Sequence, residues 1–343
     1  MQIELISDSA GIVIKHVSAL DNANKKLCFI FGERFFDASK LGGAEIFFRN
    51  GYDVILIYDA KNAWYQYLDD SMLVTVNKIY ADGEYEERIA YGISMGGYAA
   101  VQFSSILKYS MVIAFSPQFS IAIEADTRHY AISQTIEMRY AIGPESIQPS
   151  CVYHFISDHT QKLDKMHIDR FGQLIDNNWS HYYNVKYTGH STVKSLSERG
   201  ILKETLVRFM KNESVAPNFF KRNRRTSKTY LTYLAGALSE HGKNRFARIV
   251  LDEAIERWPG DHLLLKQKGI ALRRSNEPVL ACEALHQSLQ YEANDCDTFI
   301  QLSISYEGAK SLDDAIAYAQ QAIAIDSGRA WYHKHLDRLL AKA

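Results

Sequence analysis

The stretch Tyr91-Gly92-Ile93-Ser94-Met95-Gly96-Gly97 decides how the first part of this chain is expected to fold. The residues before it, 87–91, are typical of a short strand, and residues 98–107 after it are small and apolar, as in a packed helix. A sharp turn between the two strains the backbone of its central residue, and flanking glycines remove the Cβ atoms that would collide there. The pattern therefore predicts a strand, a tight turn at Ser94 and a helix.

Gly92-x-Ser94-x-Gly96 has the spacing of a nucleophile elbow, a turn that holds a serine hydroxyl at the end of a sheet. The Met95 amide would then lie at a helix N-terminus, where its N–H can stabilise an oxyanion. The same spacing also arises by chance in glycine-rich turns, but the strand before it and the helix after it favour the elbow. We expect Ser94 to be a nucleophile.

Strands and helices alternate along residues 1–211, which predicts an α/β fold with a mostly parallel sheet covered by helices on both faces. Residues 118–149 show weak periodicity, and we interpret them as an insertion or lid over the site. The expected strands are two within 2–19, then 26–31, 52–58, 87–91, 110–115, 151–156 and 182–187, and the expected helices are 44–49, 70–80, 98–107, 166–176 and 193–211.

Polar residues follow several of these predicted strands directly. They are Gly32-Glu33, Ser94, Ser116, Asp158 and His190. Ligands of such sheets bind beyond the carboxyl ends of the strands, so these residues are expected to gather at one site.

A serine is a weak nucleophile unless a base, itself oriented by a third group, takes its proton. The chain order Ser94, Asp158, His190 resembles that of the α/β-hydrolase superfamily over residues 1–211. The resemblance implies that His190, in a loop after the last predicted strand, is the base. Asp158, directly after a strand, is favoured as the acid, and Asp164 remains the alternative.

The same resemblance implies a second oxyanion amide from the loop Gly32-Glu33-Arg34, near Glu33. The chain has Phe31-Gly32 where the family commonly has His-Gly, so the identity of that amide stays open. Arg34 is either a substrate clamp or a surface charge, and Ser116 is a further candidate for substrate binding.

After residue 228 the pattern changes to helices alone, with a period of 34 residues. Ala247, Ala281 and Ala315 are spaced by 34, and small or apolar residues recur at other positions with the same spacing. Residues 229–343 resemble three tetratricopeptide repeats, with 331–343 as a capping helix. Stacked repeats of this kind form a concave groove, which implies a protein partner or self-association.

Residues 212–228 separate the two patterns and contain a basic cluster, which is interpreted as a linker with solvated charges or, alternatively, as a docking patch for an anionic partner. The cluster consists of Lys221, Arg222, Arg224, Arg225 and Lys228.

Composition limits the classes of function. The formal net charge of −1 gives no electrostatic case for nucleic acid. No apolar run is long enough for a membrane span, and the N-terminus lacks the features of a signal peptide, so a cytoplasmic location is expected. The four cysteines are scattered, which suits reduced thiols. Neither metal-binding spacing nor a phosphate-binding loop is present, so no metal or tightly bound cofactor is expected.

Together these features predict acyl transfer through an acyl-Ser94 intermediate. Water as acceptor would make the protein an esterase, and a sugar hydroxyl would make it an O-acyltransferase, with acetyl-CoA as a possible donor. The stretch 114–121, combined with the repeats, resembles hydrolase-fold proteins of bacterial polysaccharide acylation, which implies a glycan substrate. The alternative is a catalytically degenerate scaffold whose repeats hold a partner protein.

Overall fold

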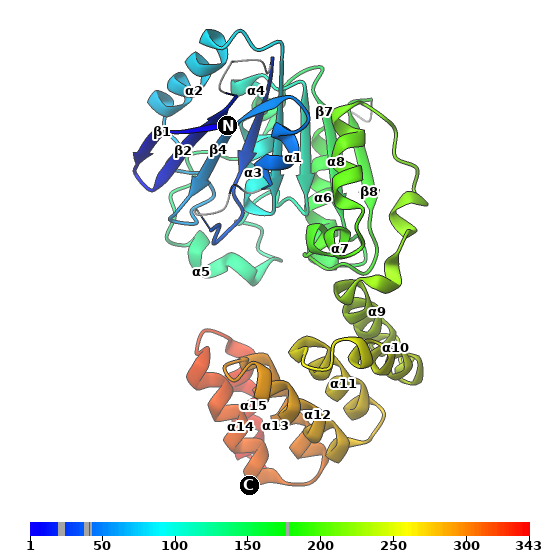
Figure 1. The fold of residues 1–343 in the computed structure, drawn as a ribbon. Coiled ribbons are helices and arrows are strands. Elements are labelled where there is room, and N and C mark those ends of the chain that lie inside the picture. The colour runs from blue at the N-terminus through cyan, green and yellow to red at the C-terminus, as the bar shows by residue number, and fades with distance from the viewer. Residues whose placement is uncertain (20–24, 38–40, 42, 176–177) are drawn as a thin grey trace. The chain divides into compact units, whose positions relative to one another are not determined.

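The computed structural model describes residues 1–343 except 20–24, 38–40, 42 and 176–177. The chain divides into two compact units, Met1–Asn223 and Arg224–Ala343 (Figure 1). The division falls inside the segment expected to be a basic linker. Within that segment, Val215, Phe219 and Phe220 are buried in an apolar layer of the first unit.

Among the described residues of the first unit, eight strands form one sheet in the order β1-β2-β4-β3-β5-β6-β7-β8. β2 pairs antiparallel with β1 and β4, and the remaining neighbours pair in parallel. This is the mostly parallel sheet that the alternation of strands and helices predicts. The strands are β1 (Gln2–Ser9), β2 (Ile12–Ser18), β3 (Lys26–Phe31), β4 (Tyr52–Asp59), β5 (Glu87–Ile93), β6 (Met111–Phe115), β7 (Val152–Ser157) and β8 (Ser180–Asn184).

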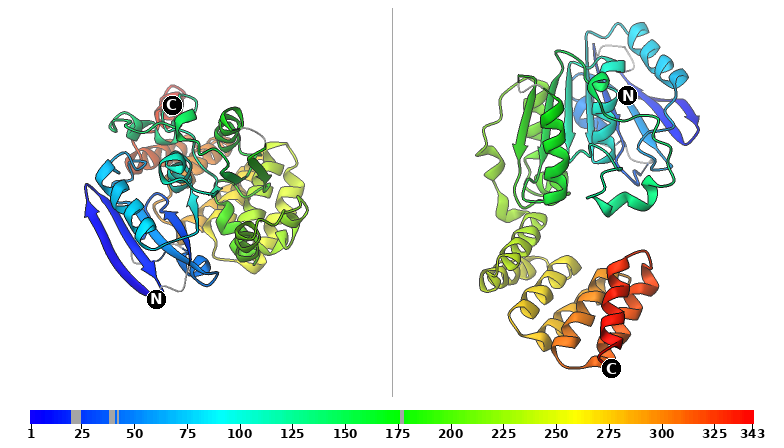
Figure 2. Two further views of the ribbon diagram at one scale, coloured as in Figure 1. Left: turned by 90° about the horizontal axis from the view of Figure 1, so that it is seen from above. Right: turned by 180° about the vertical axis from the view of Figure 1, so that it is seen from behind.

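Helices cover both faces of this sheet (Figure 2). One apolar layer receives side chains from α2 (Asp70–Asp82), α3 (Met95–Gln102) and α6 (Lys162–Leu174). The opposite layer receives them from α1 (Ala44–Phe48), α7 (Thr192–Glu198) and α8 (Leu202–Met210). β3 and β5, in the middle of the sheet, are buried between the two layers, which fixes the ends of these strands.

The helices differ from expectation at three places. The helix expected over 193–211 is broken into α7 and α8 because Gly200 adopts a left-handed conformation (φ +67°), which ends a helix. The helix expected over 98–107 is likewise split, into α3 and α4 (Ser104–Leu107). Helix α6 begins at Lys162, four residues before the expected start at 166, so Asp164 lies in its first turn.

Residues 118–149 contain only short helical segments, in agreement with an insertion rather than another strand and helix. These are η1 (Thr127–His129), α5 (Tyr130–Ser133) and η2 (Pro144–Ser146).

The turn at Ser94 has the strained geometry that its flanking glycines predict. Ser94 has φ +52° and ψ −114°, outside the regions that most side chains adopt. A Cβ atom at Gly92 would lie 2.1 Å from the Gly96 carbonyl oxygen, and one at Gly96 would lie 2.1 Å from the Phe31 carbonyl oxygen. The tight turn and the approach of α3 to β3 therefore both require glycine.

The second unit, all of whose residues are described, consists of helices in pairs, as the 34-residue period predicts. Ala247, Ala281 and Ala315 are fully buried, and a Cβ at Gly269 would lie 2.5 Å from Leu285 Cγ, so small residues allow paired helices to approach closely. The helices are α9 (Lys228–Glu240), α10 (Asn244–Arg257), α11 (His262–Arg274), α12 (Pro278–Tyr291), α13 (Cys296–Gly308), α14 (Leu312–Ile325) and the final α15 (Ala330–Leu340).

The elbow geometry predicts that Gly96→Ala destabilises the first unit, because the new methyl group collides with backbone that cannot move without shifting β3. We expect the free energy of unfolding to fall by about 3 kcal/mol, measured by urea denaturation. The control is Gly172→Ala on α6, where the nearest atom to a new Cβ is Tyr182 Oη at 3.8 Å and alanine is the better helix former. Equal stability of the two variants would contradict the packing argument.

Candidate active site

Three side chains meet at the carboxyl edge of the sheet, each placed by a different element. Ser94 lies at the start of α3, His190 lies in the loop between β8 and α7, and Asp164 lies in the first turn of α6. Ser94 Oγ is 2.8 Å from His190 Nε2, and His190 Nδ1 is 2.9 Å from Asp164 Oδ2. An ionised carboxylate only accepts hydrogen bonds, so His190 Nδ1 carries the proton and Nε2 accepts from the serine hydroxyl. This is the geometry of an activated serine.

The structure corrects the preference for Asp158 as the partner of His190. Both Asp158 carboxylate oxygens are engaged elsewhere: Oδ1 accepts from the backbone N–H and hydroxyl of Thr160, and Oδ2 accepts from the backbone N–H groups of Thr188 and Gly189. Asp158 therefore holds the loop that carries His190. The alternative, Asp164, makes the contact because α6 begins early enough to bring its first turn to the site.

A guanidinium lies behind Asp164. Arg128 Nη1 donates to Asp164 Oδ1 at 2.8 Å, while Arg128 Nε and Nη2 form a bidentate pair with Asp126 at 2.7 to 3.1 Å. Both carboxylates are almost fully buried, at 3% exposure each. Arg128 comes from the insertion, so a segment expected only to cover the site also fixes one of its acids.

His167 is the last member of this network and contacts Asp126. Its Nδ1 accepts from the Phe119 backbone N–H at 3.0 Å, so the other nitrogen, Nε2, carries the proton and donates to Asp126 Oδ2 at 2.9 Å. His167 lies one helical turn after Asp164 and is 1% exposed. The hydrogen-bonded contacts thus run from the partly exposed Ser94 and His190 through Asp164 into the insertion.

Electrostatics favour the ionised form of both acids. Burial alone would raise the pKa of the Asp164 carboxyl, but hydrogen bonds from His190 and Arg128 outweigh it and hold that pKa below its usual range. Burial opposes ionisation of Asp126 as well, and the hydrogen bonds from His167 and Arg128 lower its pKa strongly. Asp164 is therefore a carboxylate that can orient His190 at neutral pH.

The expected oxyanion amides come from two segments, the start of α3 and the loop after β3. Met95 is the first residue of α3, and the first N–H groups of a helix have no partner within it. In the loop after β3, the Gly32 N–H is occupied by the Ile57 carbonyl oxygen at 2.9 Å. Gly32 is thereby removed as a donor, and Glu33 remains the candidate for the second amide, a role that stays a prediction.

Arg34 faces the insertion. Its Nη1 lies 3.5 Å from His129 Nδ1, and the His129 ring packs against Trp64 with ring centroids 4.8 Å apart. Burial and the neighbouring Arg34 guanidinium lower the pKa of His129 to about 4, so this ring is neutral at pH 7. Arg34 is therefore a half-buried cation beside the site rather than a solvated surface charge.

Ser116 does not present its hydroxyl to a substrate. The residue is 2% exposed, and its Oγ is 3.2 Å from Thr192 Oγ1. Because Thr192 follows His190 closely, Ser116 braces the loop of the base. This corrects its assignment as a substrate-binding residue.

Asp126, Arg128 and His167 were not found as a network from the sequence. The signal was present only in part: Asp164 and His167 have the i, i+3 spacing of one helix face, but the expected helix began after Asp164. Asp126 and Arg128 stand in a segment without periodicity, so nothing in the sequence placed them. Within the described residues, no group of three or more His, Cys, Asp or Glu side chains could hold a metal ion.

Comparison with known proteins gave similarities of fold. No family model matches the chain, and no curated protein matches its sequence. The esterase Est1E from Butyrivibrio proteoclasticus aligns over 61% of this chain and 98% of its own, with a TM-score of 0.44 and 11% identity.

Two structures align with smaller parts of the chain. MamA from Desulfovibrio magneticus RS-1 aligns over 43% of this chain and 85% of its own (TM-score 0.34, 21% identity). The first TPR domain of human RPAP3 aligns over 33% of this chain and 90% of its own (TM-score 0.32, 10% identity). No helix of the described residues is both long and apolar enough to cross a membrane.

The geometry predicts different roles for the two aspartates. Asp164→Asn should lower the rate at which Ser94 reacts with a fluorophosphonate by about 10³- to 10⁴-fold, because an amide can no longer hold His190 in the required tautomer. Asp158→Asn should lower stability instead, because an amide nitrogen would face backbone donors, while the labelling rate falls less than about ten-fold. Mass spectrometry of the labelled peptide and thermal denaturation measure the two effects. A larger loss of labelling rate in Asp158→Asn than in Asp164→Asn would instead make Asp158 the acid that orients His190.

The buried network predicts a pH-dependent contribution to stability. Asp126 and Asp164 have pKa values below those of an unfolded chain, so their ionised forms stabilise the fold above about pH 4, and this contribution is lost as the pH falls. In Arg128→Met two buried carboxylates lose their cation, and we expect the free energy of unfolding to drop by about 3 kcal/mol at pH 7.

The difference in the free energy of unfolding between wild type and Arg128→Met should become smaller below about pH 4. There the Asp126 and Asp164 carboxyls of the variant take up protons and need no cation. Urea denaturation at pH 7 and at about pH 3 measures it. The control is Arg170→Met at an exposed position of α6. A difference for Arg128→Met that does not change with pH would refute the electrostatic role.

Proposed function

We propose that the first unit catalyses acyl transfer through an acyl-Ser94 intermediate, as a carboxylic ester hydrolase or an O-acyltransferase. The observation that carries the proposal is the hydrogen-bonded line from Ser94 Oγ through His190 to Asp164, with both contacts within 2.9 Å. A serine placed only for structure has no need of a base that is itself oriented by a buried carboxylate.

In this mechanism His190 Nε2 takes the hydroxyl proton as Ser94 Oγ attacks the ester carbonyl carbon. The developing negative charge lies on the carbonyl oxygen, toward the Met95 amide and an amide near Glu33. His190 then gives its proton to the leaving alcohol, and the acyl group remains on Ser94. Asp164 keeps the imidazolium in place during both transfers.

The second half of the reaction repeats these steps with another hydroxyl compound. Water gives a free carboxylic acid, whereas a sugar hydroxyl gives an acylated glycan, for which an acyl thioester such as acetyl-CoA is the proposed donor. The same three residues serve both outcomes. The half-buried Arg34 supports an oxygen-rich alcohol or leaving group on the side of the insertion, because its guanidinium offers several donors beside His129.

A protein-binding role is proposed for the second unit. Its helix pairs leave large apolar side chains exposed on neighbouring second helices, among them Phe246 on α10 (61% exposed) and Val279 on α12 (62% exposed). Stacked helix pairs offer an extended surface to a partner protein or to a second copy of this chain. Light scattering of the full chain separates these two cases.

The proposed function predicts that the purified chain hydrolyses activated acyl esters and that Ser94→Ala reduces turnover to background with the fold intact. The measurement is p-nitrophenol release with and without a sugar acceptor, in which acylated sugar detected by mass spectrometry indicates transfer. Ser110→Ala, at an exposed serine, is the matched control. Unchanged turnover in Ser94→Ala would remove the nucleophile, and a folded wild type that reacts with neither esters nor fluorophosphonate would favour the scaffold.

A further inference from the structure

An apolar cavity of about 200 Å³ lies at the carboxyl edge of the sheet, on the face covered by α1, α7 and α8. Side chains from all three helices line it, including Ile46 of α1, Val193 of α7 and Leu202 of α8. Of its described lining residues, Glu33 alone carries a charge. The cavity is therefore a place for an apolar group rather than for a sugar or a phosphate.

Residues that line the cavity are close in sequence to each part of the proposed catalytic machinery. Ile93, which lines it, directly precedes Ser94, and Val193 follows His190 by three residues. The loop Gly32-Glu33, where the second oxyanion amide is expected, forms another part of the wall. A carbonyl group held between Ser94 and this loop would have the cavity directly beside it.

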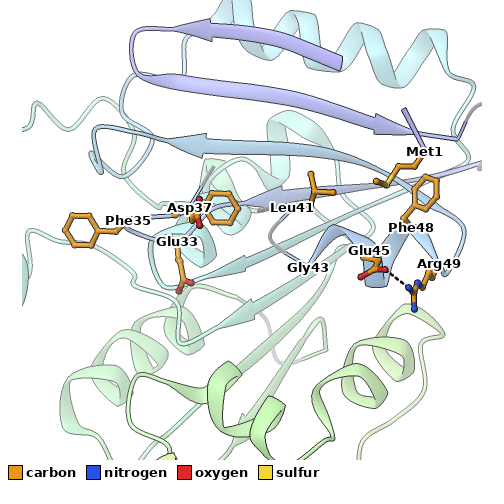
Figure 3. Close-up of a pocket in the computed structure, with 10 residues that line it drawn as sticks. Met1, Glu33, Phe35, Asp37, Leu41, Gly43, Glu45, Phe48 and Arg49 are labelled. Carbon is orange, nitrogen blue, oxygen red and sulfur yellow. Dashed lines mark hydrogen bonds and ion pairs between the residues drawn. The ribbon is translucent and has the colours of Figure 1, made fainter. Parts of the chain in front are cut away.

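A larger groove of about 980 Å³ adjoins the cavity and shares Glu33, Phe36 and Gly43 with it. Figure 3 shows Glu33 and Phe35 at one end of this groove and Met1 and Phe48 at the other. The groove is more exposed and carries charges, including the Glu45–Arg49 ion pair. Chain that extends past the enclosed cavity would thus lie along a partly polar surface.

The insertion side of the site has the opposite character. There Arg34 Nη1 lies 3.5 Å from His129 Nδ1, and the His129 ring packs against the buried Trp64. An ester bound at Ser94 therefore meets polar groups on one side and an apolar cavity on the other. This asymmetry matches a substrate with a polar alcohol and an apolar acyl chain.

We propose that this cavity binds the acyl chain of the substrate and that the preferred acyl group is an unbranched chain longer than acetyl. The proposal rests on the acyl transfer proposed above and names the class of acyl group. At about 30 Å³ for each carbon, the volume that a water molecule occupies, the cavity corresponds to a chain of roughly six carbons. The acetyl-type substrate expected from the sequence would leave most of the cavity empty.

The test is the dependence of kcat/KM on chain length for p-nitrophenyl acetate, butanoate, hexanoate and dodecanoate with the full chain. Each methylene group removed from water into the cavity should raise kcat/KM about four-fold, so hexanoate should exceed acetate by a factor on the order of a hundred. Dodecanoate should give no comparable further gain because it extends into the open groove. A wild type that prefers acetate would overturn the proposal.

Larger side chains that fill the cavity should remove the preference for hexanoate over acetate. Val193→Phe and Ile46→Trp, both at half-buried positions of the wall, should lower the ratio of the hexanoate rate to the acetate rate toward one. Val207→Phe is the matched control, since Val207 is a half-buried valine that packs against the same apolar layer but does not line the cavity. A hexanoate-to-acetate ratio in Val193→Phe equal to that of Val207→Phe would also overturn the proposal.

Binding separates failure of this proposal from failure of the proposed function. Calorimetric titration of Ser94→Ala with p-nitrophenyl hexanoate, with and without Val193→Phe, measures occupancy of the cavity without turnover. Binding that Val193→Phe weakens, together with an inactive wild type, would refute acyl transfer and retain the cavity. Turnover of acetate together with binding that Val193→Phe leaves unchanged would retain acyl transfer and refute the cavity.

Discussion

The close approach of three backbone segments around Ser94 is the constraint on which the rest of the first unit depends. Gly92, Gly96 and the end of β3 come so near to one another that a single methyl group would meet a carbonyl oxygen at 2.1 Å. This contact fixes the direction in which α3 leaves the sheet and holds the loop after β3 beside the turn. The serine hydroxyl, the first amides of α3 and the Glu33 loop therefore share one edge because of main-chain packing, before any side chain of the site is considered.

Much of the first unit could be predicted from the sequence because its signals are local. Buried parallel strands appear as short apolar runs, and the glycines of the elbow mark a turn that only they permit. Ser94 and His190 could be placed at strand ends on this basis. Their 2.8 Å contact agrees with the expectation, although the catalytic roles themselves remain to be tested.

The identity of the acid could not be predicted with the same reasoning, because it depends on tertiary structure. Asp158 stands directly after β7, but Thr160 occupies one of its oxygens and backbone N–H groups of the His190 loop occupy the other. Whether Asp164 reaches His190 depends on where α6 begins and on an arginine from a segment without periodicity. In the second unit the 34-residue period is itself a tertiary signal, which is why its helix pairs could be predicted.

The net charge of the buried network follows from the charges of its four side chains. Asp126 and Asp164 are carboxylates, Arg128 is a cation and His167 is neutral, so the group carries one negative charge at rest. In the proposed mechanism His190 takes the proton of Ser94, and the resulting imidazolium together with this group sums to zero. In that mechanism the new negative charge falls on the substrate oxygen, which faces the amides of the turn and of the neighbouring loop.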